Sequence, residues 1–481
     1  MRFRNPLEIP EIAGSVALYL EGGDFARCVQ VSRRWRDLFL SHRWRTVRTG
    51  IAPENIQTEL LGPGPDVIHT HRHLIQDLTL IGRVTVPGKH DYPNVHHLRV
   101  DMGDPDSSES ISMDLAKTFP SLVKLDLDFV QIESAFWEAL STHHHIRSMR
   151  LWCIQVGTDD TPRLWDVCKK LESLELSRVT IEGGGVSKDV VFDRLRELII
   201  WELSELDERN QMDLIIQCPM LECLEWDFDG WMTLSGSRLI NQPLQNHWPY
   251  LNKLYINCNV LDMDMALILQ SVGTGHGNIV DLQVGSCQLE TQASKALRLH
   301  FNTLVRVDFA RFHHASSTII LDILCCCPRL EVLRAKNVSA KDIAEHGPWV
   351  CQHLRELEIC FHVGDSDQDL QPLIFKRLST LVRLKHLKMN SFLRSVITDG
   401  VLEFRLESGM GQLSTLQQLA SLAFGVHSRN MRYFPQLGMD EATWIMNNWK
   451  NLKLIKGRLN KDQEIDIHLK SAFKSHGINT S

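Results

Sequence analysis

The sequence of 481 residues lacks the features of a membrane, secreted or nucleic-acid-binding protein. It has no apolar run near the roughly 18 residues that a membrane-spanning helix needs. Residues 1–16 have neither the apolar segment nor the cleavage site of a signal peptide. Acidic residues outnumber basic ones, 59 to 52, whereas a phosphate-binding surface needs an excess of Lys and Arg. These absences predict an intracellular protein, cytoplasmic or nuclear, with neither membrane nor nucleic acid as a partner.

Cysteine is present but lacks the pattern of a disulfide framework. The 12 cysteines are scattered, apart from a run at residues 325–327. Small secreted proteins instead space an even set of cysteines along a short chain. We therefore expect reduced thiols, most of them buried as small packing residues.

Motifs for catalysis, cofactor binding and metal binding are also missing. Histidines gather at residues 69–73, 143–145 and 313–314, but without the Cys-x-x-Cys or His-Glu-x-x-His spacing of a zinc site. We interpret them as solvated turn residues. The glycines at residues 183–185 lack the Lys-Ser that follows a phosphate-binding loop, and they indicate a flexible turn. We expect no enzymatic activity, no cofactor and no metal.

A repeated frame of apolar residues is what the sequence does contain. The frame Leu-x-x-Leu-x-Leu, with Ile, Val, Met or an aromatic residue allowed, recurs with a mean spacing of about 27 residues, the length of a leucine-rich repeat. We call the first apolar residue of each copy its anchor. The anchors are Ile75, Val95, Leu122, Ile146, Leu171, Leu195, Leu221, Leu251, Ile279, Leu304, Leu330, Leu354, Leu384, Leu419 and Leu452. A chain this long outgrows one globular core, so a stacked array accounts for its length.

Two copies of the repeat match closely. Residues 213–224 and 322–333 share Asp, Cys-Pro and Leu at equivalent positions. Each repeat combines alternating apolar residues, typical of a strand, with a helical segment such as 134–140 or 265–269. Proline stands two residues before several anchors and is expected to end the helix. The predicted fold is α/β, a curved solenoid of about 13 to 15 repeats with a parallel inner sheet and outer helices.

The same frame predicts which side chains face a binding partner. If the anchor and the third and fifth residues after it point inward, the second, fourth and sixth point out from the sheet. Acidic and aromatic residues dominate this outward set between residues 150 and 260, and basic residues dominate it between 306 and 388. Tryptophan and tyrosine are common in binding hot spots, although a neighbouring loop covering the tryptophan is an equal alternative. The candidate substrate-binding residues are Trp152, Glu175, Trp201, Glu225, Asp227 and Tyr255.

The amino-terminal residues lack the repeat frame and differ in charge. Residues 1–50 contain nine Arg and five acids, whereas the rest of the chain is acidic, which suggests a separate module. Its distinctive residues are Ile9-Pro10, Ile12, Val16, Leu20, Asp24-Phe25, Cys28, Val31, Trp35, Leu38 and Trp44-Arg45. In this pattern the module resembles an F-box, with Ile in place of the usual Leu before proline, Ser32 in place of a Cys, and an ending similar to that of fungal F-box proteins.

The resemblance implies a function. In F-box proteins the F-box docks on a Skp-type adaptor, which joins it to a cullin and a RING subunit, and the repeats hold the target protein. This chain would then be the substrate-recognition subunit of an SCF-type ubiquitin ligase. The adaptor-binding residues so implied are Ile9, Pro10, Ile12, Val16, Leu20, Val31 and Trp35. The alternative is a non-ligase scaffold of leucine-rich repeats, in which the amino-terminal helices only cap the solenoid.

Four segments follow from these patterns. Residues 1–48 are the expected F-box, and residues 49–73, with two Gly-Pro pairs, the expected connector. Residues 74–460 are the expected solenoid, and residues 461–481 a frayed polar tail. The identity of the target protein is left open by the sequence.

Overall fold

The computed structural model divides the chain into two compact units, Met1–Leu221 and Glu222–Ser481, which we call the first and the second unit and describe separately. The sequence pattern gave no sign of this boundary, because the repeat frame continues across it. The residues described are 9–51, 60–82, 91–103, 110–111, 115–187, 189–227, 247–272, 278–287, 289–310, 316–389, 402–425 and 435–481.

The first unit begins with three helices, α1 (Pro10–Ala17), α2 (Gly22–Val31) and α3 (Arg33–Arg45). Pro10 stands at the first position of α1, where a missing N–H costs no hydrogen bond. Ser32 separates α2 from α3, and its hydroxyl accepts a hydrogen bond from the Trp35 N–H at 3.1 Å. Phe39 on α3 is buried against the rings of Phe25 and Trp35. The expected helical module is therefore present.

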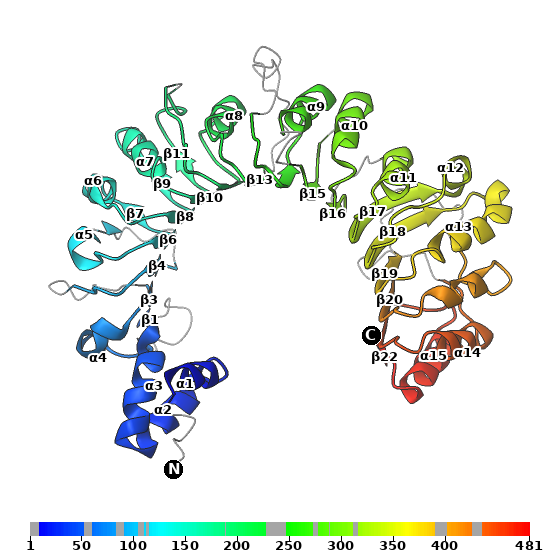
Figure 1. Ribbon diagram of the computed structural model, residues 1–481, viewed down its shortest axis with the longest axis horizontal. Helices are drawn as coiled ribbons and strands as arrows, with labels where there is room; N and C mark the ends of the chain where they lie inside the picture. Colours follow the sequence, from blue (N-terminus) through cyan, green and yellow to red (C-terminus); the bar gives the residue numbers. More distant parts are fainter. Residues whose placement is uncertain are drawn as a thin grey trace. The chain divides into compact units, whose positions relative to one another are not determined.

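Parallel strands follow the helices in the first unit, each hydrogen-bonded to the next (Figure 1). They are β1 (Thr46–Ile51), β3 (Asp77–Ile81), β4 (His97–Asp101), β6 (Lys124–Asp128), β8 (Ser148–Trp152), β10 (Ser173–Ser177) and β12 (Glu197–Trp201). The helical segments between them are α4 (Pro65–His71), η2 (Arg72–Leu74), α5 (Leu115–Thr118), α6 (Ser134–Thr142), α7 (Thr161–Cys168) and α8 (Glu208–Ile216). Short strands complete the unit: β2 (Leu60–Leu61), antiparallel to β1, then β5 (Ser110–Ile111), β7 (Gln131–Ile132), β9 (Gln155–Val156) and β11 (Thr180–Ile181).

The second unit repeats the same alternation, with all of its described strand pairs parallel. Its strands are β13 (Cys223–Asp227), β14 (Lys253–Asn257), β15 (Asp281–Val284), β16 (Arg306–Asp308), β17 (Val332–Ser339), β18 (Glu356–His362), β19 (His386–Met389), β20 (Ser421–Phe424), β21 (Leu454–Lys456) and β22 (Asn479–Thr480). Its helical segments are α9 (Asp262–Ser271), α10 (Thr291–Leu297), η4 (Arg298–His300), α11 (Ser317–Cys326), α12 (Ala340–Glu345), η5 (Asp365–Leu370), α13 (Gln371–Leu378), η6 (Met410–Thr415), α14 (Met439–Asn448) and α15 (Gln463–Ser475).

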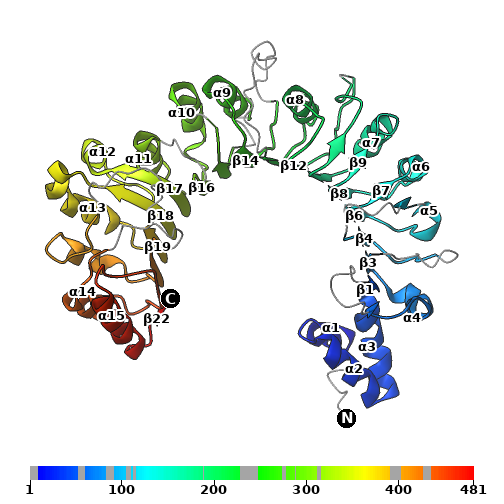
Figure 2. The ribbon, with the colours of Figure 1, turned by 180° about the vertical axis from the view of Figure 1, so that it is seen from behind.

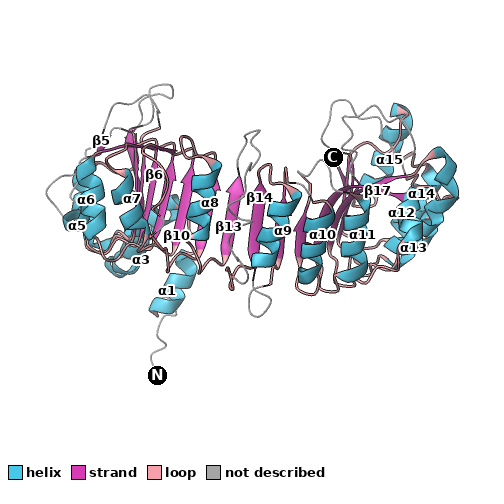
Figure 3. Cartoon of the chain, turned by 90° about the horizontal axis from the view of Figure 1, so that it is seen from above, coloured by secondary structure: helices cyan, strands magenta, loops and turns pink. Residues whose placement is uncertain are grey.

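Within each unit the strands form an inner layer and the helices an outer one, as Figures 1 and 2 show from opposite sides. Seen from above, the strands of each unit run side by side with helices along their outer surface (Figure 3). The core lies between the two layers. We call the other side of the strands, which points away from the helices, the strand face.

The apolar frame builds this core as expected. Every anchor stands two residues before a strand and is at most 5% exposed. Strand pairing aligns the third residue after each anchor into a continuous row, so equivalent side chains stack from one repeat to the next. In the second unit this buried row is Leu224, Leu254, Leu282, Val307, Leu333, Leu357, Leu387, Leu422 and Ile455. The predicted α/β solenoid of repeats is the fold of the chain.

A turn before each strand explains the prolines. The N–H of the anchor Leu122 donates to the carbonyl of Phe119 at 3.1 Å, and Leu384 donates to Leu381 at 2.9 Å. Proline fits the second position of such a turn because its φ is already fixed near the required value. Phe119 and Cys327, which stand three residues before the anchors Leu122 and Leu330, are buried. Proline therefore shapes the turn at the strand, which is a more local role than ending the helix.

Two segments differ from the expectation. Residues 49–73, expected to be a connector, hold the end of β1, all of α4 and part of η2, because Pro65 starts a helix that the Gly-Pro pairs had obscured. Residues 461–481, expected to be a frayed tail, form α15 and β22. Buried Leu469 and Phe473 share one face of α15, and β22 pairs in parallel with β21.

Side-chain carboxylates join neighbouring repeats. Asp262, at the start of α9, accepts backbone hydrogen bonds from Glu290, Gln292 and Ala293 at 2.8–2.9 Å. These N–H groups belong to the first turn of α10, where a helix has no partners of its own. One side chain therefore caps the helix of the next repeat.

Replacing this cap should destabilise the second unit. We expect Asp262→Ala to lower the free energy of unfolding by about 2 kcal/mol, because three backbone donors at the start of α10 lose a charged acceptor. Asp440→Ala is the matched control, since Asp440 is also in the first turn of a helix but is exposed. Thermal and urea denaturation measure both variants, and equal effects would contradict the capping role.

Candidate protein-interaction surfaces

The first candidate surface is on the amino-terminal helices. Helix α1 packs against α3, and its buried side chains are the small ones, Ala13 and Ala17. The large apolar residues are outside: Ile9 is 41% exposed, Ile12 38% and Val31, at the end of α2, 63%. A helix that served only the internal packing would turn its large apolar residues inward. This arrangement indicates a surface made for a partner.

Helical geometry places most of these residues on one stripe. Ile9, Ile12 and Val16 are three and four residues apart and therefore share a face of α1. The turn continues after the helix, with the Tyr19 N–H bonded to the Val16 carbonyl at 3.0 Å, which extends the stripe to Tyr19. Tyr19 is 88% exposed and Leu18 80%. Sequence reasoning missed these two residues because it followed the periodic stripe to Leu20 instead.

The expected adaptor-binding residues divide into two groups. Ile9, Ile12 and Val31 are exposed and available to a partner. Val16, Leu20 and Trp35 are half-buried, and Trp35 also packs on Phe39, with ring centroids 5.5 Å apart. For Pro10 the structure describes the backbone position only.

A ring stack connects these helices to the repeats. Trp44, at the end of α3, is 7% exposed and stacks on His71 of α4, with the ring centroids 4.3 Å apart. Burial, with the nearby charges of His73 and Arg43, lowers the pKa of His71, so the neutral ring is favoured in this contact. The tryptophan that ends the F-box pattern therefore joins the helices to the array.

The second candidate surface is the strand face of the first unit. Its charged side chains pair across neighbouring strands: Arg99 with Asp128 at 2.7 Å, His97 with Asp126 at 2.9 Å, and Arg150 with Glu175 at 3.1 Å. In the parallel register Arg150 lies directly beside Glu175. Arg99 and His97 instead reach diagonally, each to the residue two positions beyond its register partner, so charges in successive repeats pair across the strands. Sequence reasoning missed this lattice because it assigned acids to one region without matching them to bases.

Two aspartates of this lattice are buried, and their pKa values are shifted in opposite directions. Asp126 is 4% exposed and Asp128 2%. Burial acts to raise the pKa of Asp126, but the hydrogen bond from His97 and the charges of Lys124 and Arg150 outweigh it and lower that pKa. Burial raises the pKa of Asp128 despite the opposing charges of Arg150 and Arg99. Asp128 is therefore the carboxylate whose charge is poorly compensated.

The predicted substrate-binding residues of the first unit differ in exposure. Trp201, at the end of β12, is 43% exposed. Trp152 is half-buried, and the guanidinium of Arg150 lies 4.8 Å from its ring centroid. Glu175 is half-buried and bonded to Arg150. A contact within the strand face, rather than the loop we had considered, covers Trp152, whereas Trp201 is accessible.

In the second unit the predicted residues are partly engaged with one another. Asp227 accepts a hydrogen bond from the Tyr255 hydroxyl at 2.9 Å and one from the Asn257 amide at 2.8 Å. Glu225 and Tyr255 are half-buried on adjacent strands in register. The structure thus brings the three residues together on the strand face of β13 and β14.

Two other groups of residues singled out in the sequence are the histidines and the glycines at residues 183–185. His143, expected to be solvated, is only 4% exposed, and its Nε2 lies 3.0 Å from the Phe119 carbonyl oxygen. The histidine pair at 313–314 lies outside the described residues. Gly183 has a φ of +86°, as a tight turn requires, and a Cβ at Gly185 would lie 2.1 Å from Asn210, so this turn is closely packed.

All 12 cysteines are free and seven are buried, and burial raises the pKa of Cys287 to about 12. No group of three or more His, Cys, Asp or Glu side chains in the described ranges could hold a metal ion. Within the same ranges, no helix has both the length and the apolar character needed to cross a bilayer.

The strand, turn and helix of each repeat, stacked in register, define a leucine-rich-repeat protein. No family model matches the sequence, and no curated protein matches it. Among solved structures, the chain is similar to an internalin from Listeria monocytogenes, with 17% identity over 72% of this chain and 82% of that one and a TM-score of 0.43.

Two other solved structures are similar. A complex of TLR13 with ssRNA13 has 12% identity over 85% of this chain and 71% of that one, with a TM-score of 0.34. A complex of Rad7 and Elc1 in yeast has 12% identity over 95% of this chain and 94% of that one, with a TM-score of 0.35.

Proposed function

We propose that this chain is the substrate-recognition subunit of an SCF-type ubiquitin ligase, in which α1–α3 bind a Skp-type adaptor. The observation that carries the proposal is the reversed packing of α1, with Ala13 and Ala17 inside and Ile9 and Ile12 exposed. Docking on an adaptor would cover these side chains, and burying a large apolar side chain contributes about 1.5–3 kcal/mol. The F-box pattern of the sequence supports the same role.

A role as a mere cap of the array fits these helices less well. A capping segment protects the end of a solenoid and presents a polar outer surface to water. Here the outer surface has Ile12, Tyr19 and Val31, which are apolar and at least 38% exposed. This feature favours adaptor docking over the non-ligase scaffold.

The strand faces would hold the target protein, and the chain itself would catalyse nothing. In the first unit, exposed Trp201 of β12 and half-buried Trp152 of β8, which are in register on either side of β10, offer aromatic contacts. In the second unit, Glu225, Asp227 and Tyr255 offer a polar, acidic contact. Holding a target near the charged ubiquitin carrier raises its effective concentration there, which is how a non-catalytic subunit accelerates transfer.

The adaptor surface can be tested by charge substitution. We expect Ile9→Asp with Ile12→Asp to weaken binding of a purified Skp-type adaptor at least about a hundredfold, because two apolar contacts become desolvated charges. Isothermal titration calorimetry with the full chain measures the affinity.

The control variant introduces the same two aspartates at two other exposed positions of the first unit. Val67→Asp with Val123→Asp replaces two exposed valines of the first unit that lie outside α1–α3. This variant should bind the adaptor like the wild type. Undiminished adaptor binding by the Ile9 and Ile12 variant would remove the F-box assignment and leave the scaffold role.

A further inference from the structure

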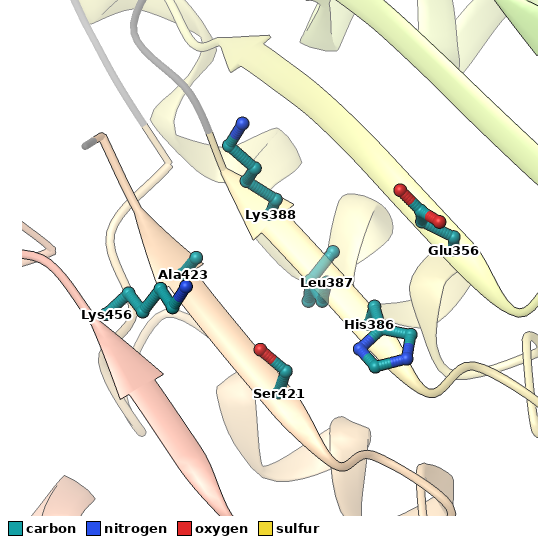
Figure 4. Close-up of a pocket in the computed structure, with 7 residues that line it drawn as sticks. All are labelled: Glu356, His386, Leu387, Lys388, Ser421, Ala423 and Lys456. Carbon is teal, nitrogen blue, oxygen red and sulfur yellow. The ribbon is translucent and has the colours of Figure 1, made fainter. Parts of the chain in front are cut away.

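The strand face of the second unit contains a hollow toward its carboxyl-terminal end. Its volume is about 380 Å³, and it opens on strands β18 to β21 (Figure 4). The residues that line it are Glu356, His386, Leu387, Lys388, Ser421, Ala423 and Lys456.

Short side chains on a single strand create the hollow. On β20 the two residues that occupy the strand face are Ser421 and Ala423. Register places Ala423 between Lys388 of β19 and Lys456 of β21. Since adjacent strands are about 4.8 Å apart, the long side chains of β19 and β21 are roughly 10 Å apart, with a gap between them. Figure 4 shows the side chain of Lys456 reaching from β21 toward Ala423.

The bases of the hollow stand on strands β19 and β21, which contain no acidic residue. Residues 384–389 include two lysines and a histidine, residues 452–457 include two lysines, and neither segment nor residues 419–425 has an acid. The two carboxylates of the neighbouring strand β18 are both engaged: Glu356 with Arg334 at 2.8 Å and Glu358 with Lys388 at 2.9 Å. On the other side, the terminal residue Ser481 accepts a hydrogen bond from the Gly457 N–H at 2.8 Å.

Lys456 differs from the other lysine of the hollow. Its side chain is exposed and, in the parts of the chain that the structure describes, forms no ion pair with a carboxylate. Lys388, in contrast, already compensates Glu358, which is 7% exposed. An anion entering above Ala423 would therefore find one uncompensated ammonium group, a second ammonium group nearby and an apolar floor at Leu387 and Ala423.

We propose that an acidic segment of a protein partner docks across β19 to β21 and places a carboxylate side chain in this hollow, against Lys456. The apolar floor suits the methylene groups of Glu, and the ammonium groups suit its carboxylate. Phosphate recognition instead favours the planar fork of arginine, and the hollow has no arginine among its lining residues. The inference rests on the protein-holding role of the strand faces and is independent of adaptor binding.

The test selects peptides on the intact protein. A displayed library of random dodecapeptides is enriched on the full chain at low salt, and the recovered peptides are synthesised for fluorescence anisotropy. We expect enrichment of peptides with Asp and Glu, and weakening of their binding as salt is raised. Replacing the acids of a bound peptide by Gln should reduce its affinity at least about tenfold.

Matched variants locate the binding in the hollow. Lys456→Glu reverses the charge of the lysine that has no ion pair in the described structure, and Ala423→Phe fills the gap. Each variant should therefore weaken binding of the acidic peptide at least about tenfold. Lys453→Glu changes the net charge equally but lies outside the lining residues, and it should change affinity less than about twofold. Circular dichroism confirms that each variant is folded.

Three outcomes would overturn the proposal. Enriched peptides could lack acids, Lys453→Glu could weaken binding as much as Lys456→Glu, or peptides with phosphoserine in place of the acids could bind more than about tenfold tighter. The last result would assign the hollow to a phosphorylated partner. None of these outcomes affects the adaptor titration, so the two proposals fail separately.

Discussion

Leu333→Asp is expected to unfold the middle of the second unit. Leu333 is fully buried and stands in register between Val307 and Leu357 in the inner row. An aspartate there would be an unpaired charge in an apolar core, one of the costliest single substitutions, and we expect a loss of at least about 4 kcal/mol. Because each repeat contacts only its neighbours, the damage should spread outward from β17.

Hydrogen exchange followed by mass spectrometry measures this effect by region. The amides of β16 to β18 should lose their protection first, while those of the first unit keep theirs. Val382→Asp introduces the same charge at a residue that is 46% exposed and should change stability by less than about 0.5 kcal/mol. Wild-type protection in Leu333→Asp would show that the inner row is misassigned.

Arg99→Gln is expected to destabilise the first unit in a pH-dependent way. The substitution removes the guanidinium that lies 2.7 Å from Asp128 and leaves a buried carboxylate with only Arg150, at 4.0 Å, as a base within ion-pair distance in the described structure. Breaking one partner of a half-exposed pair of this kind should lower the free energy of unfolding by about 2 kcal/mol at neutral pH.

The sign of the pH dependence follows from Asp128. Its pKa is raised in the folded protein by burial and should rise further without Arg99. A carboxyl group whose pKa is raised in the folded protein makes its full contribution to stability at pH values below its unfolded-state pKa. This contribution is lost as the pH rises through its folded-state pKa. The stability difference between the wild type and Arg99→Gln should therefore be large at about pH 7 and small at about pH 4, near the ordinary Asp pKa.

Urea denaturation at both pH values measures the difference. In the Asp128→Asn background no carboxylate titrates at this position, so Arg99→Gln should have the same small effect at both pH values. If Arg99→Gln were equally destabilising at both pH values with Asp128 intact, the buried carboxylate would not be the cause.

The repeat frame predicted the fold because its signal is carried by residues that must be buried. Leu224 and Leu333 come from the best-matched copies of the frame, and both are in the inner row. Apolar periodicity reports burial directly, and stacking then determines the parallel sheet. Ile9, Ile12 and Val31 were named as adaptor contacts from the F-box resemblance, and in the structure they are between 38% and 63% exposed.

The pairing of polar residues could not be predicted in the same way. Asp128 occupies an outward position, so the frame assigns it to solvent, yet Arg99 and Arg150 from adjacent repeats bury it. His143 is buried, and its ring is within hydrogen-bond distance of a carbonyl oxygen 24 residues away in sequence. Such burial depends on what the neighbouring repeat supplies, and a single repeat's sequence does not contain that information. The same limit applies to the hollow at Ala423, which is defined by residues of four strands.

The alanine packing of α1 has a consequence for its folding. A contact made by Ala13 and Ala17 removes little apolar area from water, so it holds α1 on the bundle with little free energy. A partner that covers Ile9 and Ile12 would bury larger apolar side chains than these alanines and would further stabilise the helical state of α1. Folding of this helix and binding of the partner are then linked equilibria, and part of the binding free energy is used to order the segment.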